Sequence, residues 1–335
     1  MINVAIIGAS GFTGLELVKI LVGHPKFNIT YVATSEGETT LTSLHPSLTK
    51  IFDIPVQKAD ATQIAKNTQL AFLALPHKAS MGFAQELLNL GVKVVDLSAD
   101  YRLELETYEK YYCPHEDKEH IKDAVYGLPE LYHQEIKKSS LIANPGCYPT
   151  ATLLGLLPFT EFIDENFPIF IDAKSGVSGA GKKCTDNTHF VSINENSFAY
   201  NPLMHRHQPE IAEKLYLKSG KHFDINFVPH LLPLTRGEMI DTYTLLKNPV
   251  EPLEILRDFY KDSPFVRIFD KPVDLKSPSG TNFCDIFAKC VDKKLYINSA
   301  IDNILRGASS QAVVNANLMC GFEEELGIPI IAYVP

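Results

Sequence analysis

Residues 144–150 read NPGCYPT and place Cys147 between a glycine and a tyrosine in a loop bounded by prolines. Pro149 fits the first turn of a helix, where a proline interrupts no hydrogen bond, so Cys147 is predicted at a helix N-terminus. The helix dipole and free backbone N–H groups there favour a thiolate, and the same groups bind an oxyanion during acyl transfer. The alternative is a buried structural cysteine, but the loop-forming flanks favour a nucleophile.

A nucleophilic cysteine needs a base, and His205 and His207 are the most suggestive of the 11 histidines. They flank Arg206, just before a helix that Pro209 opens. In an extended segment, residues two apart lie on one face, and a neutral imidazole at a helix N-terminus is a competent base. Either histidine is alternatively an ordinary surface or hydrogen-bonded side chain. The sequence does not separate the two; we favour His207 slightly.

Three segments carry side chains suited to an anionic substrate. Residues 172–183, DAKSGVSGAGKK, combine glycines, serines and lysines in a predicted anion-binding loop. Arg102 follows a predicted strand, and Arg236 lies in a turn between two β-like runs. The alternatives are a flexible turn, a surface Arg102 paired with Asp100, and a solvated Arg236. The candidate substrate-binding residues are Arg102, Lys174, Ser175 and Arg236.

The first residues of the chain predict a dinucleotide-binding unit. Residues 3–7 form a short apolar strand, and Gly8, Gly11 and Gly14 follow at G-x-x-G-x-x-G spacing before a helical pattern that ends at residues 24–25. Such glycines let the backbone approach a pyrophosphate, which binds at the helix N-terminus. A plain strand–helix turn is the alternative, and the N-terminal setting favours cofactor binding.

The end of the second predicted strand, residues 28–34, bears on the choice of cofactor. Thr34 and Ser35 bring hydroxyls where an NAD-preferring domain usually has an acidic residue, which favours NADP(H). The acidic residue Glu36 leaves NAD as the alternative cofactor. The candidate cofactor-binding residues are Gly8, Ser10, Gly11, Phe12, Thr13, Gly14, Ser35, Pro76, Ser178, Gly179, Gln311 and Asn315.

The surrounding pattern predicts an α/β protein. Strands at 69–75 and 92–97 enclose a helix at 78–90, and a further strand at 140–143 enters the cysteine loop, which indicates a doubly wound parallel sheet. The rest is less regular, with β-rich runs and helices that predict a mixed α+β domain: strands at 168–173, 224–231, 238–246 and 283–291, and helices near 209–217 and 251–262. We expect a cofactor domain at 1–145, rejoined by a C-terminal helix 306–335, and a catalytic domain at 146–305.

Composition excludes several classes of function. The net charge of −9, with no basic tract, argues against nucleic acid as a partner. No apolar run approaches the length of a membrane span, and the N-terminus lacks the pattern of a signal peptide, so we expect a cytoplasmic protein. The six cysteines form no C-x-x-C pair, which argues against a disulfide framework and a metal site.

The chain resembles the N-acetyl-γ-glutamyl-phosphate reductase family over essentially its full length. The resemblance implies a Rossmann domain, a mixed-sheet catalytic and oligomerisation domain, NADPH as hydride donor and a homotetramer. It places the family's nucleophile on Cys147 and its catalytic histidine within 205–207. The aspartate-semialdehyde dehydrogenases share the architecture but have Asn directly before their cysteine. The matching motifs are GASGFTGLEL at 8–17, LALPH at 73–77, DLSADYRL at 96–103, YGLPE at 126–130, NPGCYPT at 144–150, KSGVSGAG at 174–181, HRHQPEI at 205–211 and LTRG at 234–237.

One segment departs from the family pattern. Ser310 and Val314 stand where the family tends to have Gly and Gln, whereas Gln311 and Asn315 remain. We expect NADPH-dependent reduction of N-acetyl-γ-glutamyl phosphate to N-acetylglutamate 5-semialdehyde with release of phosphate, through a Cys147 thioester, in arginine biosynthesis. The alternatives are the same chemistry on an aspartyl or carrier-linked aminoadipyl phosphate, and a non-catalytic NADP-binding sensor.

Overall fold

The computed structural model describes residues 1–333 and divides into two compact units. Unit 1 comprises Met1–Pro145 and Ala308–Pro329, and unit 2 comprises Gly146–Gly307 and the C-terminal residues from Ile330 onward. The chain therefore leaves unit 1 after Pro145, two residues before Cys147, and re-enters it after Gly307. None of the helices within residues 1–333 combines the length and the apolar character that a bilayer crossing requires.

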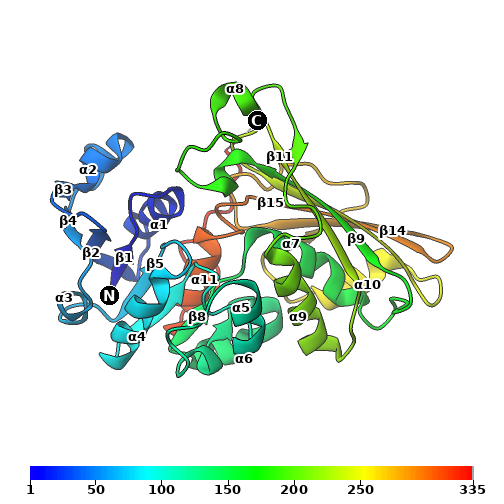
Figure 1. The fold of residues 1–335 in the computed structure, drawn as a ribbon, viewed down its shortest axis with the longest axis horizontal. Helices are drawn as coiled ribbons and strands as arrows, with labels where there is room; N and C mark the ends of the chain where they lie inside the picture. The colour runs from blue at the N-terminus through cyan, green and yellow to red at the C-terminus, as the bar shows by residue number, and fades with distance from the viewer. Residues whose placement is uncertain (334–335) are drawn as a thin grey trace. The chain divides into compact units, whose positions relative to one another are not determined.

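Unit 1 is built, within the described residues, on an eight-stranded sheet in the order β3-β4-β2-β1-β5-β6-β8-β7 (Figure 1). All neighbouring strands are parallel except β3 and β4. This confirms the predicted doubly wound parallel sheet. The strands are β1 (Ile2–Ile7), β2 (Phe27–Thr34), β3 (Thr39–Thr40), β4 (Pro55–Lys58), β5 (Leu70–Leu73), β6 (Lys93–Asp96), β7 (Val125–Tyr126) and β8 (Leu141–Ala143).

The helices of unit 1 cover a sheet whose strands β5 and β8 consist only of apolar residues. All four residues of β5 and all three of β8 are buried, as expected for parallel strands covered on both faces. The C-terminal helix α11 is buried along its whole length and packs on α1, α6 and β6. The helices are α1 (Phe12–Val22), α2 (Leu41–Leu44), α3 (Ala61–Ala65), α4 (Ala79–Asn89), α5 (Leu105–Tyr111), α6 (Pro129–Lys138) and α11 (Ser309–Met319).

Unit 2 carries, in the part of the chain that is described, a seven-stranded mixed sheet in the order β10-β11-β9-β12-β15-β14-β13. Only the pairs β9–β11 and β13–β14 are parallel. The mixed α+β architecture is thus confirmed. The strands are β9 (Ile169–Gly176), β10 (Phe198–Ala199), β11 (Ile225–Leu232), β12 (Glu238–Leu245), β13 (Val266–Ile268), β14 (Cys284–Val291) and β15 (Lys294–Ile301).

One face of the unit 2 sheet is covered by helices (Figure 1). Helix α7 packs on β12 and β15, and α9 packs on α7 and β11. Every residue of α7 after Cys147 is buried, so this helix is fixed by apolar contacts all round. Its first residue is therefore held rigidly with respect to the sheet. The helices are α7 (Cys147–Leu156), α8 (Phe190–Ile193), α9 (His207–Ser219) and α10 (Pro252–Phe259).

Candidate active site

Cys147 is the first residue of α7, so the predicted helix N-terminus is confirmed. Gly146 is the N-cap residue, with an extended backbone (φ −68°, ψ 156°). Thr150 donates to the Gly146 carbonyl from both its backbone N–H (3.0 Å) and its hydroxyl (2.8 Å), which closes the first turn. The N–H groups of a first helical turn lack acceptors within the helix. Cys147 therefore lies where the helix favours negative charge on a thiolate or an oxyanion.

Gly307 lies against the other side of Cys147. A Cβ atom at Gly307 would fall 2.6 Å from the Cys147 Cβ and 2.4 Å from the backbone oxygen of Asn303. Both distances are far below van der Waals contact, so only glycine fits at this position. The cysteine is thus enclosed by backbone on the side where unit 2 ends.

His205 and His207 lie side by side, with ring centroids 4.8 Å apart. The expectation of an extended segment is wrong: Arg206 has helical angles (φ −64°, ψ −14°) and is the N-cap of α9. The rings meet because the chain turns into the helix here. The Tyr148 ring contacts both imidazoles, each at 5.7 Å between centroids. The residue next to Cys147 therefore joins the cysteine loop to the histidine pair.

The surroundings of His205 bear on which histidine serves as the base. Burial lowers the pKa of His205 to about 4, and the neighbouring Arg206 adds to this shift. Nδ1 of His205 accepts a hydrogen bond from the backbone N–H of His207 (3.2 Å). A neutral imidazole that accepts at Nδ1 carries its proton on Nε2. His205 therefore has no ready basic nitrogen, and His207 stays our prediction for the acid–base residue.

Two tyrosine hydroxyls complete this cluster. Tyr200 donates to the Tyr148 hydroxyl (3.1 Å), which donates to the backbone oxygen of His230 (3.3 Å). Burial raises the pKa of both phenols. They stay protonated at neutral pH and present fixed dipoles beside Cys147.

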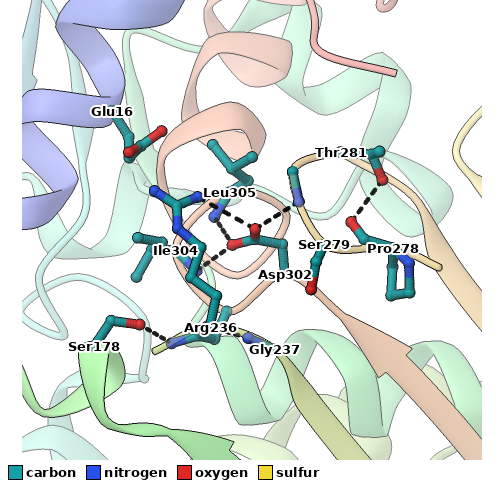
Figure 2. A network of polar contacts seen from close by, with 12 residues as sticks. Glu16, Ser178, Arg236, Gly237, Pro278, Ser279, Thr281, Asp302, Ile304 and Leu305 are labelled. Carbon is teal, nitrogen blue, oxygen red and sulfur yellow. Dashed lines mark hydrogen bonds and ion pairs between the residues drawn. The ribbon is translucent and has the colours of Figure 1, made fainter. Parts of the chain in front are cut away.

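Arg236 lies in the predicted turn between β11 and β12, but it is not solvated. Its side chain is only 14% exposed, and Nη1 donates to Oδ2 of the buried Asp302 (3.3 Å). Figure 2 shows Asp302 between Arg236 and the backbone N–H groups of Ile304 and Leu305, which donate to it at 3.0 Å each. The backbone N–H of Gly280 also donates to Asp302 (2.8 Å). The positive charge of Arg236 is thus paired with the Asp302 carboxylate of unit 2. This ion pair holds the segment that precedes Gly307.

The predicted anion loop at 172–183 is wrong in its first half. Residues 172–176 belong to β9, and Lys174 holds Asp172 (2.6 Å) and Asp241 (2.8 Å) on the sheet. An ammonium shared by two carboxylates is poorly placed to bind an anion, which disfavours the predicted role of Lys174 in binding the substrate. Ser175 is buried and donates to the Gly176 carbonyl (3.1 Å).

Ser178 and Gly179, predicted to contact the cofactor, lie in the 3₁₀ turn Val177–Ala180 after β9. The Ser178 hydroxyl accepts from the Asn303 side chain (3.0 Å), whose oxygen accepts from the Gly237 N–H (2.9 Å). The turn is therefore anchored to the same segment that Asp302 holds. Both residues belong to unit 2, whereas the glycine motif belongs to unit 1.

Arg102 is buried in unit 1, at 6% exposure, which excludes the surface alternative. Its Nε donates to the backbone oxygen of Asn144 (2.7 Å) and its Nη2 to that of Leu97 (2.8 Å). These bonds hold the guanidinium rigidly, and one of them reaches Asn144, the first residue of the loop that leads into Cys147. A guanidinium oriented in this way is preorganised for a carboxylate or a phosphate.

The glycine motif of unit 1 has the geometry that a dinucleotide requires. Gly8 has φ +95°, and a Cβ there would fall 2.2 Å from the backbone oxygen of Ala74. A Cβ at Gly14 would fall 2.5 Å from the Gly8 oxygen, so a glycine is needed where α1 crosses the turn. Gly11 is the N-cap residue of α1, and a Cβ atom there would meet no atom closer than the Gly8 oxygen at 3.7 Å. This cradle fits a pyrophosphate on the helix N-terminus.

The remaining cofactor candidates divide into two groups. Ser35 and Pro76 are exposed where β2 and β5 end, and Ser10, Phe12 and Thr13 lie on or beside the turn into α1. Gln311 and Asn315 are fully buried, and both side-chain amides donate to the Gly127 carbonyl (3.0 and 2.9 Å). These bonds tie α11 to the loop before α6, which favours a structural role for the pair over direct cofactor contact.

Two family models match the chain. The NAD binding domain of semialdehyde dehydrogenase matches residues 3–139, and its dimerisation domain matches residues 147–303. The N-acetyl-gamma-glutamyl-phosphate reductase of Sulfurovum sp. (strain NBC37-1) is 59% identical over 335 residues, covering 100% of both chains. That of Sulfurimonas denitrificans is 58% identical, covering 100% of this chain and 99% of the relative. The chain belongs to the N-acetyl-gamma-glutamyl-phosphate reductase family.

Membership of the N-acetyl-gamma-glutamyl-phosphate reductase family makes the chain an NAD(P)-binding oxidoreductase. Its fold is similar to solved aspartate semialdehyde dehydrogenases. One, aspartate semialdehyde dehydrogenase II from Vibrio cholerae in complex with ASA, has a TM-score of 0.73 at 17% identity, covering 96% of this chain and 98% of that one. Another, from Candida albicans with NADP, has a TM-score of 0.72 at 13% identity, with the same coverage.

Four side chains near Cys147 were not predicted from the sequence: Tyr148, Tyr200, Glu210 and Glu238. Two of them carried a local signal. Tyr148 directly follows the cysteine, and Glu210 stands three residues after His207, on the same side of a helix. Tyr200 and Glu238 carried none, because only the folding of unit 2 brings them to α7.

Proposed function

We propose that the chain reduces N-acetyl-γ-glutamyl phosphate to N-acetylglutamate 5-semialdehyde with NADPH and releases phosphate, in arginine biosynthesis. The names of the full-length relatives support this substrate. One observation carries the chemistry: Cys147 begins the buried helix α7, and its neighbour Tyr148 contacts both His205 and His207.

The proposed reaction proceeds through Cys147. The thiolate attacks the acyl carbon, a C–S bond forms, and the C–O bond to phosphate breaks, which leaves a thioester. NADPH supplies a hydride that reduces this thioester. The resulting hemithioacetal releases the aldehyde and the thiolate. His207 is the proposed acid–base residue, and the first-turn N–H groups of α7 stabilise the oxyanion.

Among the charged candidates, Arg102 is our proposal for binding an anionic group of the substrate. Its guanidinium is buried and fixed by the carbonyls of Asn144 and Leu97. Arg236 and Lys174 are less suited, since each is balanced by buried or half-buried carboxylates. A fixed guanidinium loses little entropy on binding, which favours specific recognition.

The preference for NADP over NAD is also a proposal. It rests on the exposed Ser35 at the end of β2, since Thr34 already accepts a hydrogen bond from the Gly37 N–H (3.0 Å). Glu36 is exposed beside it. A ratio of kcat/KM for the two cofactors, measured with Ser35→Ala as comparison, tests this choice: the substitution should lower the value for NADPH more than that for NADH.

We further propose a cytoplasmic homotetramer. Support comes from the match to a dimerisation domain and from two aromatic side chains of the unit 2 sheet. Phe170 on β9 and Tyr243 on β12 are register partners, 46% and 48% exposed. Paired exposed aromatic side chains are typical of surfaces that bind a partner. Light scattering after size-exclusion chromatography measures the mass, and Tyr243→Lys should dissociate the assembly.

The decisive experiment is the reverse reaction. N-acetylglutamate semialdehyde and NADP⁺ should yield NADPH only when phosphate or arsenate is present, because the thioester needs an oxyanion acceptor. NADPH formation without either anion would contradict the proposal and indicate an aldehyde dehydrogenase that releases the acid. A higher kcat/KM for aspartate semialdehyde than for N-acetylglutamate semialdehyde would instead identify aspartyl phosphate as the substrate.

A Cys147→Ala variant separates an enzyme from a sensor. It should lose turnover by at least about 10³-fold, yet still bind NADPH, since the glycine cradle lies in unit 1. Retained turnover would overturn the covalent route. A sensor would show no turnover in the wild-type protein and no single fast-reacting thiol among the six.

A further inference from the structure

Glu238 is a buried carboxyl group that the proposed reaction has not yet used. It is the first residue of β12, between Ser175 of β9 and Ile301 of β15, and its exposure is 0%. Within residues 1–333, neither carboxyl oxygen has a hydrogen-bond partner of ordinary geometry. Buried carboxyl groups are almost always paired with a cation or with several donors. Glu238 therefore needs an explanation other than stability.

The Cys147 thiol lies against this carboxyl group. Helix α7 packs on β12, and contact with the thiol is the strongest side-chain influence on Glu238. A thiol is a weak donor whose hydrogen moves freely, which accounts for a contact without ideal hydrogen-bond geometry. The unpaired acid of unit 2 thus faces its proposed nucleophile.

The other charged or titratable groups around Glu238 come from three segments. Asp302, after β15, raises the pKa of Glu238, and Tyr148 and Tyr200 are influenced by both Glu238 and Cys147. The cations on the adjoining segments are used elsewhere: Lys174 by Asp172 and Asp241, and Arg236 by Asp302. The surroundings therefore disfavour a carboxylate at Glu238 and favour the neutral acid.

We propose that Glu238 is a second catalytic acid–base residue, which exchanges the thiol proton of Cys147 directly. The proposal rests on the function proposed above. It assigns the proton on sulfur to Glu238 and leaves His207 to serve the oxygen atoms of the substrate. A residue in contact with the attacking atom is the shortest route for that proton.

The proton balance is as follows. With one proton between them, the pair exists as thiol and carboxylate or as thiolate and carboxylic acid, and the second form attacks. While the thioester exists, Glu238 keeps the proton. When the C–S bond of the hemithioacetal breaks, its electron pair returns to sulfur, and Glu238 gives the proton back. The released phosphate takes its own proton from solvent, so the pair ends each turnover as it began.

The acidity of Glu238 suits this exchange. Burial raises its pKa to about 8, contact with the thiol opposes that shift, and Asp302 adds to it. An ordinary thiol has a pKa of about 8.5, so a proton passes between a thiol and this carboxyl group with little change in free energy. A carboxyl group of ordinary pKa would leave the proton on sulfur.

The test measures how fast iodoacetamide alkylates Cys147 between pH 6 and 10, with mass spectrometry to identify the modified residue. In the wild-type protein the rate should rise in two steps, because the pair loses two protons. In Glu238→Gln it should rise in one step, because only the thiol titrates there. Identical profiles would overturn the proposal.

A matched control is Asp241→Asn, which neutralises a buried carboxylate on the same strand that contacts Lys174 rather than Cys147. It should keep the two-step profile, and a loss of one step there would contradict our assignment to Glu238. A second measurement needs no variant. Alkylation of the wild-type protein should perturb the infrared band of a protonated carboxylic acid, and the absence of such a band would also overturn the proposal.

These results separate the two proposals. An active Cys147→Ala enzyme overturns the thioester route and with it any catalytic part for Glu238, even if the alkylation profile has two steps. An inactive Cys147→Ala enzyme with a one-step wild-type profile overturns Glu238 alone. If both hold, Glu238→Gln should lower kcat by about 10²-fold and leave KM for the acyl phosphate unchanged.

Discussion

Oε1 of Glu210 accepts a 3.0 Å hydrogen bond from the backbone N–H of Gly146, the residue directly before Cys147. Glu210 is 1% exposed and lies in the first turn of α9, three residues after His207. The helix that carries the proposed acid–base residue thus also holds the loop that carries the proposed nucleophile. The position of the thiol and that of the imidazole are set by one helical turn.

Glu210→Ala removes the acceptor of this hydrogen bond and leaves a buried N–H group unpaired. We expect a loss of about 1–3 kcal/mol in the free energy of unfolding, and a lower kcat because the loop before Cys147 shifts. Glu210→Gln keeps an amide oxygen at the same distance and should lose less of both. Urea unfolding and steady-state kinetics on the two variants check this; equal losses would mean that the charge, not the hydrogen bond, is what matters.

His207→Ala should lower kcat by about 10²–10⁴-fold, because it removes the proposed acid–base residue. His205→Asn should have a smaller effect, since an asparagine oxygen can still accept the His207 N–H bond that His205 now accepts. Steady-state kinetics at pH 7 compare the two variants. A larger loss in His205→Asn would reverse the assignment.

His205 should also make stability depend on pH. Its pKa is lowered to about 4 in the folded protein, against about 6.5 in an unfolded chain. Between these values the unfolded chain binds the extra proton, so stability is full above pH 6.5 and falls as the pH drops towards 4, by at most about 1.4 kcal/mol per pH unit. The difference between wild type and His205→Asn in urea unfolding at pH 4.5, 5.5 and 7 measures this contribution.

The comparison of wild type with His205→Asn is needed because two other groups also make the stability depend on pH. The pKa of Asp96 is raised by burial to about 6, and that of Glu238 to about 8. Each contributes stability that is present at low pH and lost as the pH rises through its folded value. These contributions oppose that of His205 in the wild-type curve but cancel in the comparison. A constant difference across the three pH values would refute the assignment to His205.

Gly11→Ala tests cofactor binding without disturbing the fold. A Cβ at Gly11 meets no atom closer than 3.7 Å, so the melting temperature should stay unchanged. The methyl group would occupy the approach of the pyrophosphate to the N-terminus of α1, and the Kd for NADPH should rise by about tenfold or more. Fluorescence titration measures this. Gly8→Ala is the contrasting variant, since φ +95° and the Ala74 oxygen should make it unstable.

The elements around the site were predictable because their signals are local. The apolar strands of unit 1, the glycine turn and the helix start at Cys147 each depend on a few consecutive residues. The helical backbone angles of Arg206 were not predictable, because helix α9 begins two residues earlier than Pro209 suggests. Helix boundaries depend on capping and packing that a short window of sequence does not contain.

The partners of the charged residues were not predictable for a different reason. Arg236 pairs with Asp302 across 66 positions, and Lys174 pairs with Asp241 across 67. Glu238 lies beside Cys147 although 91 positions separate them in sequence. Such pairings are decided by strand order and register. Residue type alone indicated the same anion-binding role for Lys174, Arg236 and Arg102. The fold distinguishes them, because it places carboxylates beside Lys174 and Arg236.

The clash that a side chain at Gly307 would make with Cys147 sets a limit on how the protein can be divided. The matched dimerisation domain ends at residue 303, four residues before Gly307. A fragment cut at that point would retain Cys147, the proposed nucleophile, and both histidines, but would lose the backbone that encloses the thiol. A fragment of unit 2 made for study should therefore end beyond Gly307, because this residue at the border of the unit also encloses the proposed nucleophile.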